Sequence, residues 1–246
     1  LGDSTTVSRS SPVQVGTSSW TAVYGGWDQF AAKRADGTLW VWGRNNVGQL
    51  GLNDTVNRSS PVQMSGSWGK LSTNVYSVGL IRNDGTLATE GLNNGGQLGD
   101  STIQNKSTVV SIGAIPVQPT PYQYVTGSWT AVAAGNTFTG AIDTNNLLYA
   151  FGRNNLGQLG LNDTVSRNSP VQVGTDSWTL VSAGGTGMNA KRSDGLLFSW
   201  GSNSFGQLGL GNTVSSSSPV QVNSTSWTVL ALGGSSSSHM GAIGSN

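Results

Sequence analysis

The sequence contains no cysteine, a single histidine, His239, and a single glutamate, Glu90. The absence of thiols excludes disulfides, cysteine-based metal sites and cysteine nucleophiles. One histidine leaves a Ser/His/Asp triad or a histidine metal site without the further partners it needs. With one glutamate, a pair of catalytic carboxylates would have to come from aspartates. The sequence therefore predicts a protein that is not an enzyme and that uses no metal or cofactor.

Charge is scarce as well. Charged residues make up 9% of the chain, and the formal net charge is +1. A nucleic-acid-binding domain usually carries a clear basic excess, so this composition disfavours nucleic acid as a partner. No apolar run approaches the roughly 18 residues of a membrane-spanning helix, so no membrane span is predicted.

Glycine is abundant, with 36 residues, and much of it belongs to a repeated stretch. Residues 43–51 read Gly-Arg-Asn-Asn-Val-Gly-Gln-Leu-Gly, and close copies occupy 152–160 and 201–209, with a weaker copy at 91–99. Whole units run over 16–64, 65–124, 125–173 and 174–222, with partial units at 1–15 and 223–246. An internal repeat of this length predicts a repeat architecture.

Each unit is predicted to contain four short strands. In the first unit these are residues 20–24, 29–33, 38–42 and 61–64, with Asp36-Gly37 as the hairpin corner between the second and third. Four strands at a period of about 49 residues are typical of a propeller blade. One such sheet cannot bury both of its faces, so neighbouring blades must stack. We predict an all-β fold, a β-propeller built from four-stranded blades of about 49 residues, with 1–246 forming one propeller domain or a segment of one.

The repeated motif resembles that of a known repeat family. Gly-X-Asn-X-X-Gly-Gln-Leu-Gly, preceded by Asp-Gly-X-Leu-X-X-Trp-Gly, resembles the RCC1-type repeat (regulator of chromosome condensation-like) over essentially the whole chain. The resemblance implies an RCC1-like β-propeller, commonly of seven blades. Members of that family act in guanine-nucleotide exchange on a small GTPase, in chromatin binding, or as secreted inhibitors and binders, and the fold alone does not choose among these.

A cation stands eight residues after the loop leucine in four of the five units, and Ser216 breaks the pattern after Leu208. These cations are Arg9, Arg58, Lys106 and Arg167. One interpretation is an arc of cations that meets an acidic surface. The alternative is a side chain that caps strand or loop carbonyls in the same way in each blade, and repeated residues usually serve repeated structure.

The second unit departs from the others in two ways. Glu90 stands where the first unit has Trp42. The unit also carries an insertion of about twelve residues, around positions 113–122. The candidate binding residues of this insertion are Pro116, Pro119, Pro121 and Tyr122. Insertions in repeats map to loops on one face, often the binding face, but loops also tolerate neutral insertions.

Trp27 has no counterpart in the other units. An exposed aromatic side chain can anchor a partner, and a single one can equally be buried by its neighbours.

The function predicted from these observations is a non-enzymatic structural or binding propeller of a secreted, cell-surface or virion (phage-like) protein that contacts a protein or a glycan. In its low charge and its Ser, Thr and Asn content, the chain resembles the RCC1-type repeats of bacterial surface and phage proteins more than those of nuclear proteins. The alternatives are an intracellular (cytoplasmic or nuclear) RCC1-like regulator that binds a small GTPase or chromatin, and a secreted enzyme inhibitor.

The partial units at the two ends of the chain do not add up to one whole repeat unit. Leu1 aligns with Leu50 and Asn246 with Asp36, so the repeat positions of 37–49 have no counterpart between the ends. A blade closed by both termini would lack its third strand and leave backbone groups unpaired. We therefore expect the chain to be a segment of a longer polypeptide with six or more units.

Overall fold

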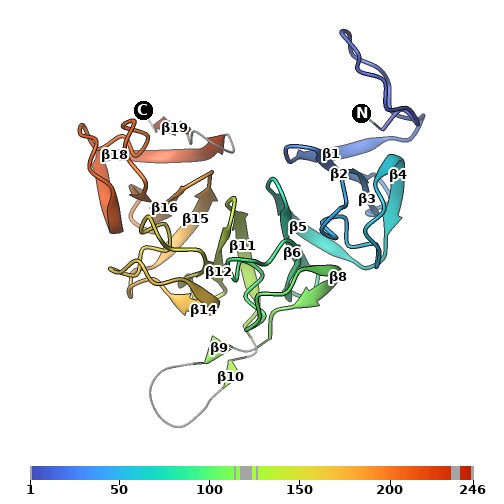
Figure 1. Ribbon diagram of the computed structural model, residues 1–246. Helices are drawn as coiled ribbons and strands as arrows, with labels where there is room; N and C mark the ends of the chain where they lie inside the picture. The colour runs from blue at the N-terminus through green and yellow to red at the C-terminus, as the bar shows by residue number, and fades with distance from the viewer. Residues whose placement is uncertain (1, 114, 117–123, 126, 234–238, 245–246) are drawn as a thin grey trace.

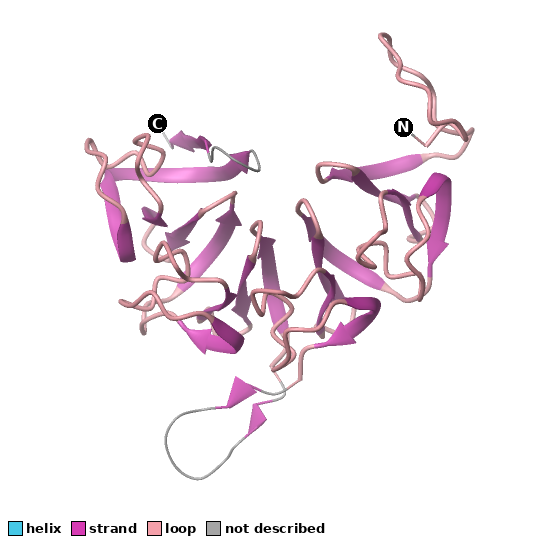
Figure 2. Ribbon diagram, viewed as in Figure 1, coloured by secondary structure: helices cyan, strands magenta, loops and turns pink. Residues whose placement is uncertain are grey.

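The computed structural model describes residues 2–113, 115–116, 124–125, 127–233 and 239–244. All of its regular elements are strands. Apart from a separate two-stranded sheet, they form antiparallel blades that follow one another along an arc, with β1 and β19 at its two ends (Figures 1 and 2). Within the described residues, no helix has the length and apolar character needed to cross a membrane. The predicted all-β propeller architecture is confirmed.

The first three blades each contain four strands in sequence order. The first blade is β1 (Trp20–Gly25), β2 (Gln29–Arg34), β3 (Leu39–Gly43) and β4 (Arg58–Met64). The second is β5 (Trp68–Thr73), β6 (Ser77–Arg82), β7 (Leu87–Gly91) and β8 (Lys106–Ser111). The third is β11 (Trp129–Ala134), β12 (Phe138–Asp143), β13 (Leu148–Gly152) and β14 (Arg167–Gln172).

The last sheet has five strands, because β18 links the fourth blade to the first two strands of the next unit. It consists of β15 (Trp178–Ala183), β16 (Gly187–Arg192), β17 (Leu196–Gly201), β18 (Ser216–Gly233) and β19 (His239–Gly244). The sequence predicts a break near Val222, but β18 runs straight through it. Leu196 pairs with Ser226, so the link between units stays extended and joins the fourth strand of one unit to the first strand of the next.

The predicted start of the fourth strand at Pro61 is wrong, because β4 begins three residues earlier, at Arg58. The pairing shifts between Val41, opposite Val62, and Gly43, opposite Arg58. This bulge leaves residues 59–61 outside the regular ladder, so the missing N–H of proline costs no ladder hydrogen bond.

The core lies between adjacent blades. Each of the four blades buries a leucine at the equivalent position of its third strand, namely Leu39, Leu87, Leu148 and Leu197. Trp178 of β15 and Phe138 of β12 belong to one buried cluster that joins the third and fourth blades. Burial of a large side chain of this kind contributes about 1.5–3 kcal/mol, so each blade depends on its neighbour for much of its stability.

Two glycines of the repeated loop bring each blade against the next. Gly157 has φ +76°, and a Cβ placed there would lie 2.5 Å from the Cα of Ser217 in the next blade. A Cβ on Gly160 would lie 2.7 Å from Nε1 of Trp200. Both positions need glycine because a neighbouring blade fills the space of any side chain.

Candidate protein-binding surface

The turns between the first and second strands and the long loops after the third strands share one end of the blades. The N–H of Arg44 donates to the carbonyl of Asp28 at 2.8 Å, and the N–H of Arg153 donates to that of Thr137 at 2.7 Å. We call this end the loop face. It consists of the turns 26–28, 74–76, 135–137 and 184–186 and the loops 43–57, 91–105, 152–166 and 201–215.

A buried asparagine organises each loop. Asn154 is fully buried, and its Oδ1 accepts a hydrogen bond from the N–H of Leu159 at 2.9 Å. Its Nδ2 donates to the carbonyl of Asp163 at 3.0 Å and to the Oδ1 of the same residue at 2.9 Å. The equivalent residues Asn45, Asn93 and Asn203 are also fully buried. Since these amides satisfy the backbone of the loop, its shape is the same in each blade.

The loops turn an apolar side chain outward. The N–H of Val56 donates to Asp54 Oδ1 at 2.9 Å, and this local bond directs the valine side chain into solvent, where it is 60% exposed. We call the exposed loop residues the apolar row. They are Val7, Val56, Ile103, Val165 and Val214. Ile103 lies one loop position earlier than the valines, and Phe205 of the fourth loop adds an aromatic ring that is 83% exposed.

The four recurring cations form ion pairs within their own units. Arg58 contacts Asp54 Oδ2 at 2.5 Å, and its Nη1 donates to the carbonyl of Val56 at 2.6 Å. The equivalent pairs are Arg9–Asp3, Lys106–Asp100 and Arg167–Asp163. The N–H of Val56, followed by the Arg58 guanidinium, holds the pKa of Asp54 below its usual range. Arg167 likewise donates to the carbonyl of Val165 at 2.5 Å, so in these two units the cation also meets a loop carbonyl.

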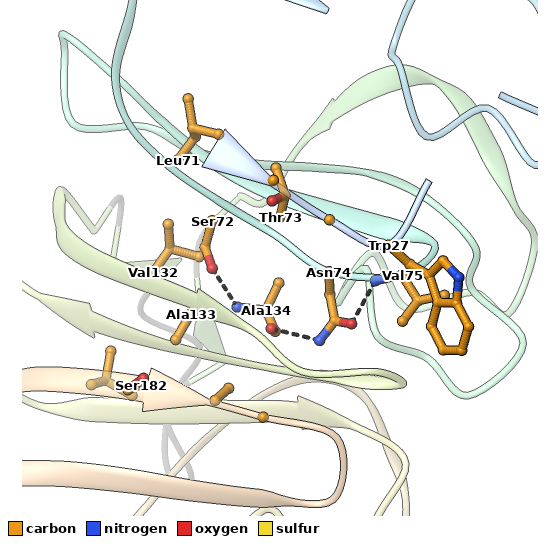
Figure 3. A pocket seen from close by; sticks show the side chains of 15 residues that line it. Trp27, Leu71, Ser72, Thr73, Asn74, Val75, Val132, Ala133, Ala134 and Ser182 are labelled. Atoms are coloured by element: carbon orange, nitrogen blue, oxygen red, sulfur yellow. Dashed lines mark hydrogen bonds between the residues drawn. The ribbon is translucent and has the colours of Figure 1, made fainter. Parts of the chain in front are cut away.

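Trp27 lies at the rim of a hollow between the innermost strands of the four blades (Figure 3). Its ring is 62% exposed. The hollow has a volume of about 470 Å³ and is lined by the ends of β1, β5, β11 and β15. In its wall, Asn74 of the second blade donates to the carbonyl of Ala134 in the third at 2.9 Å, and Ser72 accepts from the N–H of Ala134 at 3.0 Å. Asn74 and Ser72 therefore hold the second blade to the third, and the part of the exposed Trp27 in binding stays a prediction.

Glu90 lies in the second blade, at the interface with the first. Only 1% of the residue is exposed, and its Oε2 has no hydrogen-bond partner among the described residues. Burial raises the pKa of Glu90 well above its ordinary value. The carboxyl of Glu90 is thus buried against Gly51, in the loop of the first blade, and its part in binding stays a prediction.

The insertion of the second unit forms a two-stranded ladder, β9 (Ile115–Pro116) and β10 (Tyr124–Val125), that projects from the outer rim of the arc (Figure 1). Pro116 lies in β9. Pro119, Pro121 and Tyr122 lie outside the described residues, and their part in binding stays a prediction.

Sequence reasoning missed the apolar row and Arg153. The signal for the row was present, because Asn-Asp-Thr-Val places a valine in an otherwise polar loop in two units. Whether Arg153 has an ion-pair partner depends on the residue that faces it from a neighbouring turn. The repeated motif does not include that residue. Among the described residues, no three His, Asp or Glu side chains gather as metal ligands would.

Four-stranded blades, stacked through glycine-rich loops that present equivalent side chains on one face, define a repeat β-propeller. The model of the regulator of chromosome condensation (RCC1) repeat matches residues 36–79, 145–188 and 194–238, and a second RCC1 repeat model matches 129–158. The chain belongs to the RCC1 repeat family. No curated protein matches the chain in a sequence comparison.

Solved RCC1-like propellers share this fold. Human WBSCR16 is 20% identical, with a TM-score of 0.76 over 89% of this chain and 57% of its own. Prp20p from Saccharomyces cerevisiae, described with its binding to Gsp1p and histones, is 16% identical, with a TM-score of 0.76 over 95% of this chain and 58% of its own. Yeast RCC1 (Prp20) bound to Kap60 is 17% identical, with a TM-score of 0.75 over 96% of this chain and 56% of its own. The chain thus spans somewhat more than half the length of these relatives.

Proposed function

We propose that the chain is a non-enzymatic propeller module that binds another protein through its loop face. The observation that carries the proposal is the apolar row, in which successive loops present an exposed valine or isoleucine at nearly the same position. Exposed apolar groups that recur along one face are typical of interaction sites. The local hydrogen bonds that fix the loops lower the entropy cost of binding, because the surface is ordered before the partner arrives.

The relatives support a protein partner. Prp20p binds Gsp1p and histones, and yeast RCC1 is found in complex with Kap60. These partners favour an intracellular regulator that contacts a small GTPase or a chromatin protein. The ion pairs of the loops leave the loop face with little net charge, so apolar contacts would supply most of the affinity.

The second candidate is a secreted, cell-surface or virion module. The low charged content of 9% supports it. In that setting Trp27 and the hollow beside it would contact a protein or a glycan, since an aromatic ring beside amides and hydroxyls suits a sugar face.

Titration of the immobilised chain with purified Gsp1p and with purified core histones tests the first candidate. A triple variant, Val56→Ser, Val165→Ser and Val214→Ser, should weaken binding at least about tenfold, because it removes three apolar anchors. Val220→Ser, which changes a 36% exposed valine of β18, is the control. Binding that the triple variant leaves unchanged would contradict the role of the loop face.

Two further measurements separate the candidates. Binding to an immobilised glycan panel, lost on Trp27→Ala, would favour the surface module. Accelerated release of labelled GDP from Gsp1p would contradict the non-enzymatic assignment, because we expect binding without exchange.

A further inference from the structure

Arg153 and Arg44 occupy equivalent positions in two loops and have different surroundings. Arg44 contacts Asp28 Oδ2 at 3.3 Å, donates from Nε to Asn46 Oδ1 at 2.9 Å, and lies 5.6 Å from the ring centroid of Tyr76. In the third unit the residue at the place of Asp28 is Thr137. Because threonine carries no charge, Arg153 lacks the ion pair that its counterpart makes.

The guanidinium of Arg153 is exposed, and among the described residues it forms no ion pair or hydrogen bond. The base of its side chain lies close to the loop of the second blade, since a Cβ on Gly95 would lie 3.3 Å from the Cβ of Arg153. A cation of the third blade thus stands beside the loop of the second, with all five of its N–H donors open to a partner.

This cation lines a groove of about 450 Å³ between the loops of the second and third blades. The lining residues are Asn94, Gly95, Ile103, Arg153, Ser166, Arg167 and Asn168. Two of them are cations and none is acidic, and Arg167 is already paired with Asp163. Ile103 supplies an apolar wall that is 60% exposed.

The walls of the groove are firmly joined. The N–H of Ser101 donates to the carbonyl of Asn168 at 2.7 Å, and Nδ2 of Asn168 donates to the carbonyl of Ser101 at 3.1 Å. These two bonds tie the loop of the second blade to β14 of the third. The groove is therefore preorganised, and little ordering entropy is lost when it is filled.

We propose that this groove binds an acidic peptide segment of the partner, with a carboxylate on Arg153 and an adjacent apolar side chain on Ile103. A guanidinium matches a carboxylate with two parallel hydrogen bonds, and a single uncompensated cation beside an apolar wall fits one carboxylate next to one apolar residue. A polyphosphate or nucleic acid needs several free cations along its backbone, whereas the second cation of this groove is paired. The inference names the partner chemistry for one part of the loop face and rests on the proposed function.

The test uses the full chain and two fluorescein-labelled ten-residue peptides, measured by fluorescence anisotropy. One peptide alternates Glu with Leu, and the other alternates Gln with Leu. The acidic peptide should bind, and the amide peptide should bind about tenfold more weakly, because it lacks the charge that Arg153 requires. Equal binding of the two peptides, or no binding of the acidic one, overturns the proposal.

Three variants locate the site. Arg153→Ser should weaken binding of the acidic peptide about tenfold, and Ile103→Ser should weaken both peptides. Arg44→Ser removes the equivalent cation that already has a partner and should change binding less than about twofold. An equal loss in Arg44→Ser would show unspecific charge attraction, and tighter binding of a labelled oligothymidylate than of the acidic peptide would show a nucleic-acid groove. Both results overturn the proposal.

The outcome is distinguishable from failure of the proposed function. Loss of Gsp1p or histone binding in the triple valine variant, together with no effect of Arg153→Ser, would retain the loop face as a binding surface and reject the acidic segment alone.

Discussion

The Oε2 atom of Glu90 lies against Gly51, in the place that the indole Nε1 of Trp200 takes against Gly160. In the fourth blade that nitrogen donates to the carbonyl of Gln158 at 3.1 Å. In the third blade the equivalent carbonyl, of Gln97, accepts from Thr139 Oγ1 at 2.9 Å. The loop carbonyl of one blade thus takes a side-chain hydrogen bond from the next.

For the second blade, the carbonyl equivalent to that of Gln158 belongs to Gln49. A neutral carboxyl at Glu90 can donate a proton to a carbonyl, and a carboxylate cannot. Burial also opposes the charged form, which raises the pKa of Glu90 well above its ordinary value. The interface between the first two blades therefore favours protonated Glu90.

Glu90→Gln should stabilise the protein at neutral pH. An amide keeps a donor at the position of Oε2 and cannot ionise. Because the folded pKa of Glu90 is raised, its stabilising contribution is complete below the unfolded pKa and is lost as the pH rises through the folded pKa. We expect a gain of about 1–3 kcal/mol at pH 8, the cost of a buried polar group without its partner, and no gain near pH 4.

Urea unfolding of both proteins between pH 4 and pH 8 measures this difference. The comparison is made at each pH, because other groups titrate identically in the two proteins. A difference that does not change with pH would mean that Glu90 ionises normally in the folded state.

Trp200→Ala should destabilise the protein by roughly 3–5 kcal/mol, because the buried ring leaves a cavity between blades. Trp200 is 0% exposed, and the same loss is expected for Trp42, which is 5% exposed. The exposed Trp27→Ala is the control and should cost less than about 1 kcal/mol. Denaturant unfolding gives all three values, and a loss under about 1 kcal/mol for Trp200→Ala would contradict the packing of that ring.

Gly157→Ala should separate the third and fourth blades. Its Cβ would collide with the backbone of Ser217, which cannot rotate away, so overpacking of about 1–3 kcal/mol adds to the strain of a positive φ. Gly37→Ala is the matched control, since Gly37 has φ +82° and a Cβ there would meet nothing within 4 Å. The loss of thermal stability in Gly37→Ala measures the backbone strain alone. The loss in Gly157→Ala measures the strain together with the collision. Equal losses would show that the loops do not hold the blades together.

Asn154→Ala should unfold the third loop. The substitution leaves the buried N–H of Leu159 and the carbonyl of Asp163 without the partner that Asn154 supplies, at a cost of about 2–4 kcal/mol. Asn155→Ala is the control, because Asn155 is exposed and its Oδ1 accepts only a 3.5 Å bond from Gln158. Hydrogen exchange at Leu159 reports on the loop directly, and protection that survives in Asn154→Ala would contradict this role.

Much of the fold could be predicted because its determinants are local and repeated. Asp36-Gly37 specifies a hairpin corner through its own side chain, whose Oδ1 accepts from the N–H of Thr38 at 2.9 Å. The cation pairs are also short-range, since Asp54 lies four residues before Arg58 and Asp3 six residues before Arg9. The spacing of aspartate and cation therefore predicts these ion pairs. The interpretation of the cations as an arc that faces a partner did not use this spacing.

The elements that differed from expectation depend on pairing between strands. Arg58 joins β4 because Gly43 lies opposite to it across a bulge, and β18 passes Val222 because Ser226 still pairs with Leu196. A strand boundary is set by the neighbouring strand, so a pattern read along one segment does not locate it.

The sequence by itself determined the repeat, the strand order within a blade and the buried positions, because a period near 49 residues and alternating apolar side chains act within each unit. The tertiary structure decided the properties that carry the functional proposals. Arg153 is unpaired because Thr137 replaces an aspartate on a different turn, Ile103 meets it only across two blades, and Glu90 is buried because the first blade covers it. These properties arise from contacts between units, because each blade forms part of the surroundings of the next. The repeat motif specifies only the contacts within its own unit.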